Sequence, residues 1–322
     1  MSPPGRDVTE LVTQARQGHP RAVARLISLI EDGAPELRAV AAALAPDTGR
    51  AHVTGITGPP GAGKSSTINA MVTALRAVGE RVGVLAVDPS SPFSGGALLG
   101  DRVRMQEHFT DSGVFIRSMA TRGHLGGIAW ATPQALRVLA AAGCAELLVE
   151  TVGVGQSEVE VMALADTTVV LLAPGMGDGV QAAKAGILEI ADVFVVNKAD
   201  REGADQVVRE LKHIIALGRA GIPDPSWRPP VIRAVAVRAE GIDELLAAIA
   251  EHRQWMRGCG ELEARRQRRA EAEVEAIALA RLRGKLSDVL RGSALPGLAK
   301  RVVAGELDVY RAADELIAEL RA

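Results

Sequence analysis

The sequence predicts an α/β fold with a mainly parallel central sheet flanked by helices, a helical extension before the sheet and a helical arm after it. Seven short apolar runs alternate with helical stretches between residues 51 and 250. Unbroken apolar runs are typical of strands that are covered on both faces, as in parallel sheets. A glycine-rich stretch at 58–65 also joins the first run to a helical pattern, which is a recurring strand-to-helix connection in such folds.

The composition narrows the class of protein. The chain has 322 residues, of which 48% are hydrophobic, enough for one large α/β core with helical additions. Its net charge of −2 indicates neither nucleic-acid binding nor attraction to a membrane surface. Cys144 and Cys259 lack the spacing of a disulfide framework, and no apolar run approaches the roughly eighteen residues of a membrane span. The start shows no signal-peptide pattern, so we expect a soluble cytoplasmic protein.

Apolar residues at spacings of three and four, with glycine–proline breaks, predict helices over residues 8–45. The seven expected strands are 52–58, 82–88, 114–118, 146–150, 168–174, 193–197 and 231–237. Beyond about residue 243 the chain is helical again. Residues 261–275 are almost all charged or Ala, which is typical of a solvated helix or one that docks on a partner. We therefore expect a helical extension at 1–50, an α/β domain at 51–250 and a helical arm at 251–322.

A phosphate-binding loop is predicted at GPPGAGKS, residues 58–65, which fits the pattern G-x-x-x-x-G-K-[ST]. An ordinary glycine-rich turn is the alternative, but the loop follows an apolar strand and opens a helix, as the motif requires. Lys64 would reach the β- and γ-phosphates, and the Ser65 hydroxyl would bind Mg²⁺. Backbone N–H groups and the helix dipole favour a phosphate here. The nucleotide-binding residues expected in this stretch are Gly58, Pro59, Pro60, Gly61, Ala62, Gly63, Lys64, Ser65 and Ser66.

Carboxylates at the ends of other strands are candidates for the metal site and, with Lys64, for the catalytic set. Asp88 ends the second strand and Glu150 ends the fourth, so both would lie at the edge of the sheet that carries the phosphate loop. Glutamate is one methylene longer than aspartate, so we expect Glu150 to bind a metal-bound water. Asp101 is a further candidate, although a helix N-cap explains it equally well. Gly153 is expected to sense the γ-phosphate.

A base-reading motif is predicted at NKAD, residues 197–200, directly after the sixth apolar run. Asn and Asp are also common in turns, so the four residues alone do not decide. Beside a phosphate site, Asp200 would accept two hydrogen bonds from guanine, Lys198 would cover the base and Asn197 would brace neighbouring loops. Adenine presents the wrong donors and acceptors, and polar sites of this kind discriminate by roughly 10⁴–10⁵. GTP is therefore the expected nucleotide.

Four longer stretches resemble one family. VDPSSPFSGGALLGDRVRM, GVFIRSMATRGHLGGIA, ETVGVGQSEVEV and QAAKAGILEIADVFVVNKADREGAD are similar to the MeaB/ArgK/MMAA family of P-loop GTPases associated with methylmalonyl-CoA mutase. The resemblance covers about residues 8–290. It implies a P-loop G domain, an N-terminal helical extension and a C-terminal arm that forms a homodimer.

The resemblance also implies ligands, a partner and roles. GTP or GDP and Mg²⁺ are the implied ligands, with Asp88, Asp101 and Glu150 around the metal and the attacking water. The implied partner is an adenosylcobalamin-dependent methylmalonyl-CoA mutase. Members of the family gate the loading of its cofactor and help to eject damaged cofactor, with GTP binding and hydrolysis as the switch.

One position departs from the usual G-domain pattern. Where Ser-Ala often places a backbone N–H on the guanine oxygen, this chain has Val235-Ala236, and a backbone contact survives a change of side chain. A charge-stabilising arginine would accelerate hydrolysis by about 10³–10⁵. The arginines in the region where one is expected are each explained better as surface or ion-pairing residues; they are Arg102, Arg104, Arg117 and Arg122. Without a positioned arginine, hydrolysis would be slow until the mutase stimulates it.

Three other functions compete with this one. A P-loop kinase of the arginine/ornithine transport type would prefer ATP, and the NKAD motif argues against it. A nickel metallochaperone GTPase normally carries clustered His or Cys ligands, whereas the six histidines here are scattered. A nucleotide-dependent interaction module with negligible turnover would keep the same site residues, so the sequence leaves that alternative open.

Overall fold

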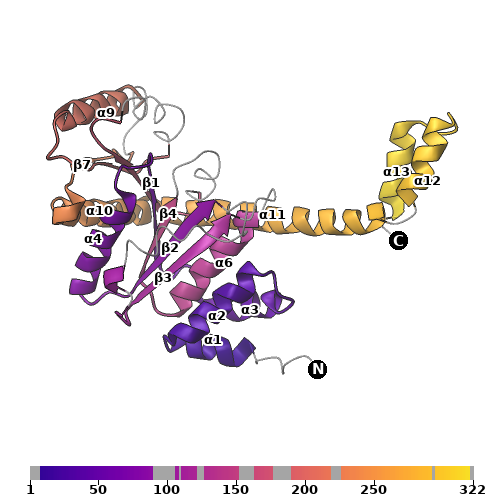
Figure 1. The fold of residues 1–322 in the computed structure, drawn as a ribbon, viewed down its shortest axis with the longest axis horizontal. Coiled ribbons are helices and arrows are strands. Elements are labelled where there is room, and N and C mark those ends of the chain that lie inside the picture. Colours follow the sequence, from indigo (N-terminus) through magenta and orange to yellow (C-terminus); the bar gives the residue numbers. More distant parts are fainter. Residues whose placement is uncertain are drawn as a thin grey trace. The chain divides into compact units, whose positions relative to one another are not determined.

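The computed structural model divides the chain into two compact units, Met1–Arg269 and Ala270–Ala322. The first unit contains the whole sheet, and the second is helical (Figure 1). The structure describes residues 8–89, 106–108, 110–121, 127–151, 163–176, 190–218, 226–291 and 294–319. Within these ranges no helix has both the length and the apolar character that a membrane span needs.

Seven strands form one sheet, and every neighbouring pair is parallel. The strands are β1 (His52–Thr57), β2 (Val82–Pro89), β3 (Val114–Thr121), β4 (Glu146–Thr151), β5 (Thr167–Leu172), β6 (Val193–Val196) and β7 (Val231–Arg233). Their order is β3-β2-β4-β1-β5-β6-β7. This confirms the predicted α/β fold. The bounds of the first six strands agree with the prediction to within three residues at each end. The last strand differs most, because it ends at Arg233 and residues 236–238 form a 3₁₀ turn, η3 (Ala236–Arg238), instead of extending to 237.

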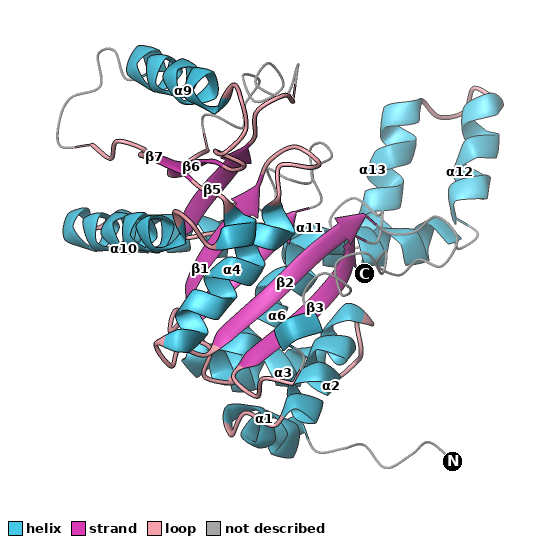
Figure 2. Cartoon of the chain, turned by 60° about the vertical axis from the view of Figure 1, so that its left-hand side comes forward, coloured by secondary structure: helices cyan, strands magenta, loops and turns pink. Residues whose placement is uncertain are grey.

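Helices cover both faces of the sheet, which explains the unbroken apolar runs (Figure 2). One face packs on α4 (Lys64–Ala77) and α10 (Ile242–Cys259), through alternate strand residues such as Val169 and Leu171. The residues between them point to the opposite face. On that face α6 (Gly127–Ala141) covers β2, β3 and β4, and α9 (Ala204–Gly218) covers β5 and β6.

The N-terminal residues form three helices, as predicted. They are α1 (Val8–Arg16), α2 (Pro20–Glu31) and α3 (Leu37–Leu44), followed by the short η1 (Ala45–Asp47). Leu26 and Ile30 are fully buried in the same apolar cluster as α6. Arg117 on β3 forms an ion pair with Glu31 on α2 and donates to the hydroxyl of Ser28 at 3.1 Å. Arg117 is therefore an ion-pairing residue that ties this extension to the sheet.

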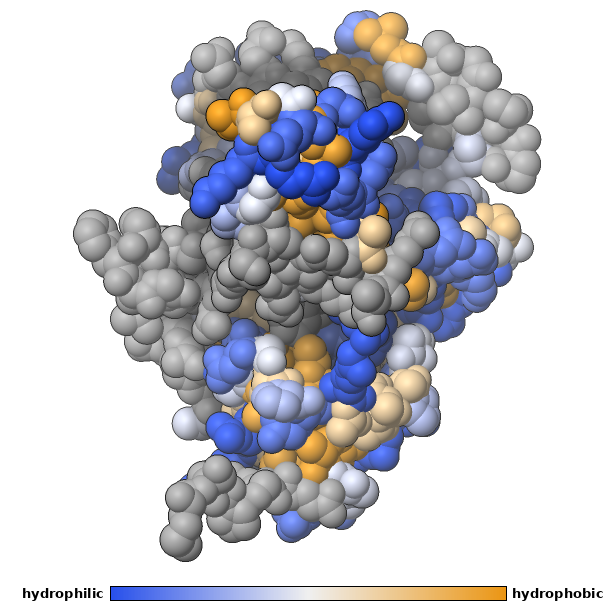
Figure 3. All heavy atoms as spheres, turned by 90° about the vertical axis from the view of Figure 1, so that its right-hand side faces the viewer, coloured by the Kyte–Doolittle hydropathy of each residue, from blue (hydrophilic) through white to orange (hydrophobic). Residues whose placement is uncertain are grey.

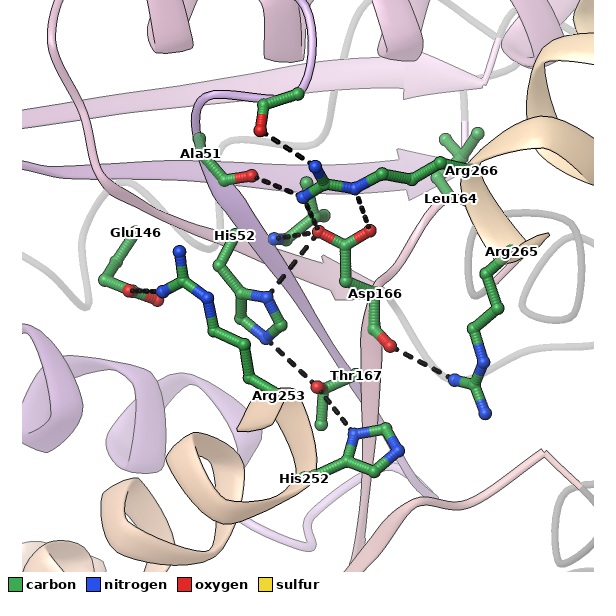
Figure 4. Close-up of polar contacts among 12 residues, drawn as sticks. Ala51, His52, Glu146, Leu164, Asp166, Thr167, His252, Arg253, Arg265 and Arg266 are labelled. Atoms are coloured by element: carbon green, nitrogen blue, oxygen red, sulfur yellow. Dashed lines mark hydrogen bonds and ion pairs between the residues drawn. The ribbon is translucent and has the colours of Figure 1, made fainter. Parts of the chain in front are cut away.

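A buried ionic cluster ties the start of α11 (Glu261–Arg291) to the amino ends of β5 and β6 (Figure 4). The carboxylate of Asp192 receives two hydrogen bonds from Arg265, each of 2.8 Å. The carboxylate of Asp166 receives bonds from Arg266 at 2.9 and 3.2 Å and from Arg269 at 2.9 Å. Burial raises the pKa of Asp166, but the arginines outweigh it and hold the pKa at about 2. The charged start of α11 is therefore partly buried and not simply solvated.

Two histidines, a threonine and a glutamate lie beside this ionic cluster, near the amino ends of the strands. The hydroxyl of Thr167 lies 3.0 Å from His52 Nε2 and 2.9 Å from His252 Nδ1, and all three residues are buried. Burial lowers the pKa of His52 to about 4, so its imidazole is neutral. Glu146 pairs with Arg253 at 3.1 Å, yet burial raises the pKa of this carboxyl to about 7.

The second unit includes α12 (Ala294–Val303) and α13 (Val309–Glu319). Arg301 on α12 pairs with Glu315 on α13 at 2.6 Å. Several large apolar side chains here are exposed in the single chain; they are Val274, Ile277, Leu279, Leu282, Leu295, Val303, Val309, Tyr310 and Ile317. Figure 3 shows one face of the molecule, where hydrophobic residues lie among hydrophilic ones.

Candidate nucleotide-binding site

The phosphate loop follows β1 and opens α4, the context that the motif requires. Three of its glycines have positive φ: Gly58 at 141°, Gly61 at 79° and Gly63 at 96°. A Cβ on Gly58 would lie 2.2 Å from the carbonyl oxygen of Leu171, and a Cβ on Gly63 would lie 2.2 Å from Nδ2 of Asn197. At both positions the backbone is left-handed, which favours glycine. A side chain at Gly58 would collide with fixed backbone, and one at Gly63 would displace the amide of Asn197.

Lys64 lies inside the curve of this loop. Its side chain is buried, and Nζ donates to the carbonyl oxygens of Gly58 at 2.7 Å and Pro59 at 3.4 Å. Loop carbonyls thus hold the ammonium group at the N-terminus of α4, where the helix dipole also favours an anion. The position and charge are those needed for a phosphate-binding lysine.

Ser65 and Glu150 meet at the carboxyl edge of the sheet. Glu150 is the penultimate residue of β4, which pairs with β1 so that Ile56 lies opposite Glu150. Ser65 Oγ donates to Glu150 Oε1 at 2.8 Å, and both residues are buried. A hydroxyl and a carboxylate are the hard oxygen ligands that Mg²⁺ prefers, so this pair fits the metal that the motif implies.

Of the other two predicted metal ligands, Asp88 and Asp101, the structure describes only the backbone of Asp88. Asp88 lies on β2, opposite Ala120 of β3 and one residue beyond the Val87–Thr151 pair with β4. Its backbone is therefore at the same edge as Glu150, while its side chain lies outside the described structure. Asp101 and Gly153 also lie outside the described residues, as do Arg102, Arg104 and Arg122.

Asn197 joins the base-reading motif to the phosphate loop. Its backbone N–H donates to Leu172 of β5 at 2.8 Å. Its side chain is buried: Nδ2 donates to the carbonyl oxygen of Ala62 at 2.8 Å, and Oδ1 accepts the N–H of Ala236 at 3.1 Å. One amide thus holds the phosphate loop on one side and the loop after β7 on the other. This is the bracing contact expected of Asn197.

Lys198 and Asp200 complete the motif. Lys198 has a φ of 56°, uncommon for a residue with a side chain, and its Nζ donates to the carbonyl oxygen of Gly61 at 2.7 Å. Its stem therefore extends from the NKAD turn to the phosphate loop. Asp200 is exposed, and its Oδ2 lies 3.3 Å from Nη1 of Arg238. Arg238 was not predicted from the sequence, because the fold of the loop after β7 alone brings it to Asp200.

The loop after β7 carries the Val235-Ala236 pair. Both residues are buried, and Val235 pairs with Glu240 in an isolated antiparallel bridge. Valine is apolar and is suited to a buried position of this kind. The N–H of Ala236 is engaged by Asn197 in this structure.

All these elements meet at one edge of the sheet. β1 lies between β4 and β5. After β1 the chain passes to β2 on one side of it, and after β4 it passes to β5 on the other side. In parallel α/β folds, ligands bind outside the carboxyl ends of the strands at such a point. The phosphate loop and the NKAD turn follow the carboxyl ends of β1 and β6, and Glu150 lies one residue before the carboxyl end of β4.

Comparison with known proteins agrees with this geometry. Residues 23–289 match the model of the methylmalonyl-CoA mutase-associated GTPase MeaB family. The chain belongs to this family. A protein of Pyrococcus abyssi is 47% identical over 313 residues, 97% of each chain. The GTPase ArgK of Escherichia coli is 35% identical over 268 residues, 82% of this chain and 81% of that one.

A solved structure supports the same fold. The crystal structure of a LAO/AO transport system kinase matches with a TM-score of 0.69 and 26% identity, over 98% of both chains. The family and the P-loop fold together indicate guanine-nucleotide binding. The predicted resemblance and fold class are therefore confirmed.

Proposed function

We propose that this family member binds GTP with Mg²⁺, hydrolyses it to GDP and phosphate, and thereby acts as a chaperone of an adenosylcobalamin-dependent methylmalonyl-CoA mutase. In that role it gates loading of the cofactor and protects or reactivates the mutase. The observation that carries the nucleotide part is the joining of the NKAD turn to the phosphate loop, through Asn197 to Ala62 and Lys198 to Gly61. The family match supports the mutase part.

Guanine recognition follows from the two loops that Asn197 holds. Asp200 accepts the two N–H groups of the guanine edge, and the stem of Lys198 covers one face of the base. Because Asn197 fixes the NKAD turn to the phosphate loop, the base and the phosphates of one nucleotide bind to the two loops at the same time. The backbone at Val235 and Ala236 closes the remaining side. Adenine leaves Asp200 without its donors, so ATP is disfavoured.

Hydrolysis requires positioning and charge neutralisation and little covalent chemistry. Lys64 stabilises negative charge on the β- and γ-phosphates. Ser65 and Glu150 hold the metal shell, Glu150 through a bound water, with Asp88 and Asp101 as further carboxylates. The Mg²⁺ ion, when bound, neutralises charge on the phosphate oxygens. Gly153 follows β4 and contacts the γ-phosphate.

The mutase is expected to accelerate hydrolysis. Arg117 is engaged with Glu31 on α2, away from the phosphate loop in the fold, so it does not supply the catalytic charge. An arginine brought to the site in the complex adds about 10³–10⁵ in rate. The protein alone is therefore a slow GTPase. We place it in the cytoplasm, as a homodimer whose exposed apolar side chains on α11 to α13 are covered by the second subunit.

Turnover of GTP and ATP, measured side by side with and without methylmalonyl-CoA mutase, tests this proposal. Slow, GTP-selective turnover that the mutase stimulates and Lys64→Ala abolishes is the expected result. ATP turnover indifferent to the mutase would favour a transport-type kinase instead. Nucleotide-dependent mutase binding without turnover would favour an interaction module.

A further inference from the structure

A network of three charged side chains lies beside the base-reading motif. Arg238 Nε donates to Glu240 Oε1 at 2.7 Å, and Nη2 donates to Glu240 Oε2 at 3.2 Å. The remaining nitrogen, Nη1, donates to Asp200 Oδ2 at 3.3 Å. A guanidinium group is planar, so two bonds to Glu240 also fix the direction in which Nη1 points. That direction is towards the carboxylate proposed to bind guanine.

The loop that carries Arg238 is held by its own backbone. Val235 N–H donates to the carbonyl oxygen of Glu240 at 3.0 Å, and Arg238 N–H donates to that of Val235 at 2.8 Å. Gly241 closes the loop with a φ of 78°, where a Cβ would lie 2.1 Å from the carbonyl oxygen of Arg233. Arg238 and Glu240 therefore start from fixed backbone positions.

Fold stability does not explain this network. The side chains of Asp200, Arg238 and Glu240 are 40%, 50% and 58% exposed. Ion pairs this exposed contribute little to the free energy of unfolding. An exposed aspartate otherwise samples several side-chain rotamers, and only one of them presents both oxygens to guanine. Ordering a side chain on binding lowers affinity, so a residue that orders it beforehand raises affinity.

Arg238 does not compete with the base for Asp200. A carboxylate offers about four lone-pair sites, and guanine uses two of them. Asp200 Oδ2 therefore accepts from Arg238 and from the base together. We propose that Arg238, held by Glu240, is a positioning residue that orients the Asp200 carboxylate for guanine and sharpens specificity for it. This inference rests on the proposed function, because it concerns the same nucleotide site.

Equilibrium titration of the full-length protein with GDP and with inosine diphosphate tests the inference. Inosine diphosphate lacks the 2-amino group of guanine, so it makes one bond to Asp200 where GDP makes two. Arg238→Gln should weaken GDP binding roughly two- to tenfold and inosine diphosphate binding less, so that the ratio of the two affinities falls. Glu240→Gln should act in the same direction with a smaller effect. Arg238→Lys keeps the charge without the planar fork and should restore only part of the ratio.

Arg301→Gln is the matched control, since it also breaks an exposed arginine–glutamate pair but lies on α12. Its ratio of GDP affinity to inosine diphosphate affinity should equal that of the wild type. The thermal midpoints of all three glutamine variants should stay close to that of the wild type. GDP binding by Arg238→Gln that is equal to or tighter than wild type would overturn the inference, as would equal weakening of both nucleotides. A wild-type protein that fails to bind GDP would overturn the proposed function, and this inference with it.

Discussion

Replacing Gly63 by alanine should destabilise the nucleotide-free protein by more than backbone strain alone. Gly63 has a φ of 96°, so alanine there costs about 1 kcal/mol. Its Cβ would also lie 2.2 Å from Asn197 Nδ2, so the amide has to move. That movement breaks the hydrogen bonds of Asn197 to Ala62 and Ala236, each worth about 1 kcal/mol. The expected total is about 3 kcal/mol.

Gly79→Ala isolates the strain term. Gly79 has a φ of 87°, and no heavy atom lies within 4 Å of the position where its Cβ would be. Alanine at Gly79 therefore carries the strain without a collision. Both changes restrict the unfolded chain equally, so this effect cancels in the comparison. The two variants should differ by about 2 kcal/mol, the two hydrogen bonds of Asn197.

Urea denaturation of wild type, Gly63→Ala and Gly79→Ala without nucleotide measures this difference. Equal destabilisation by both variants would refute the reasoning, because it would mean that Asn197 does not hold the phosphate loop. If Gly63→Ala destabilises more than Gly79→Ala in the wild type but equally in an Asn197→Ala background, the excess is due to the side chain of Asn197.

Three further predictions concern the amino ends of the strands and the metal site. Asp166→Asn should lower the unfolding free energy at pH 7 by about 2 kcal/mol, since the fall of its pKa from 3.8 to about 2 stabilises the ionised native state. The difference from wild type in urea titrations should persist above about pH 4 and shrink towards pH 2. Glu146 has a pKa raised from 4.5 to about 7, so its stabilising contribution is complete below pH 4.5 and is lost as pH rises through 7. The unfolding free energy of Glu146→Gln should therefore rise relative to that of the wild type as pH increases from 4.5 to above 7. A difference between the two proteins that does not change with pH would contradict this. Ser65→Ala should weaken GTP binding more in Mg²⁺ than in EDTA, and equal weakening in both titrations would contradict its role as a metal ligand.

Much of the nucleotide site could be predicted from the sequence because its parts are local. The phosphate loop is contiguous, and its glycines are needed for positive φ at Gly58 and Gly63. The NKAD turn follows a buried strand, and the carboxyl ends of parallel strands share one edge. The contact of Asn197 with the phosphate loop follows from that topology, and the structure contains it.

What the sequence did not reveal depends on contacts between distant segments. Arg238 reaches Asp200 only because the chain turns back between Val235 and Glu240, and a lone Arg-Ala-Glu predicts no such turn. The arginines at the start of α11 look like a solvated face, since their partners Asp166 and Asp192 stand between 73 and 103 residues earlier in the chain. A single aspartate before a strand does not predict an ion pair with an arginine of a distant helix.

The most direct test of the account is the nucleotide specificity of Asp200→Asn. Guanine offers two N–H donors to the Asp200 carboxylate, whereas xanthine offers one N–H and one carbonyl oxygen, which suit an asparagine amide. The account predicts that Asp200→Asn loses at least tenfold in GTP affinity and gains affinity for XTP, measured by equilibrium titration. An unchanged preference for GTP over XTP would contradict the assignment of this site as a guanine-nucleotide site read by Asp200.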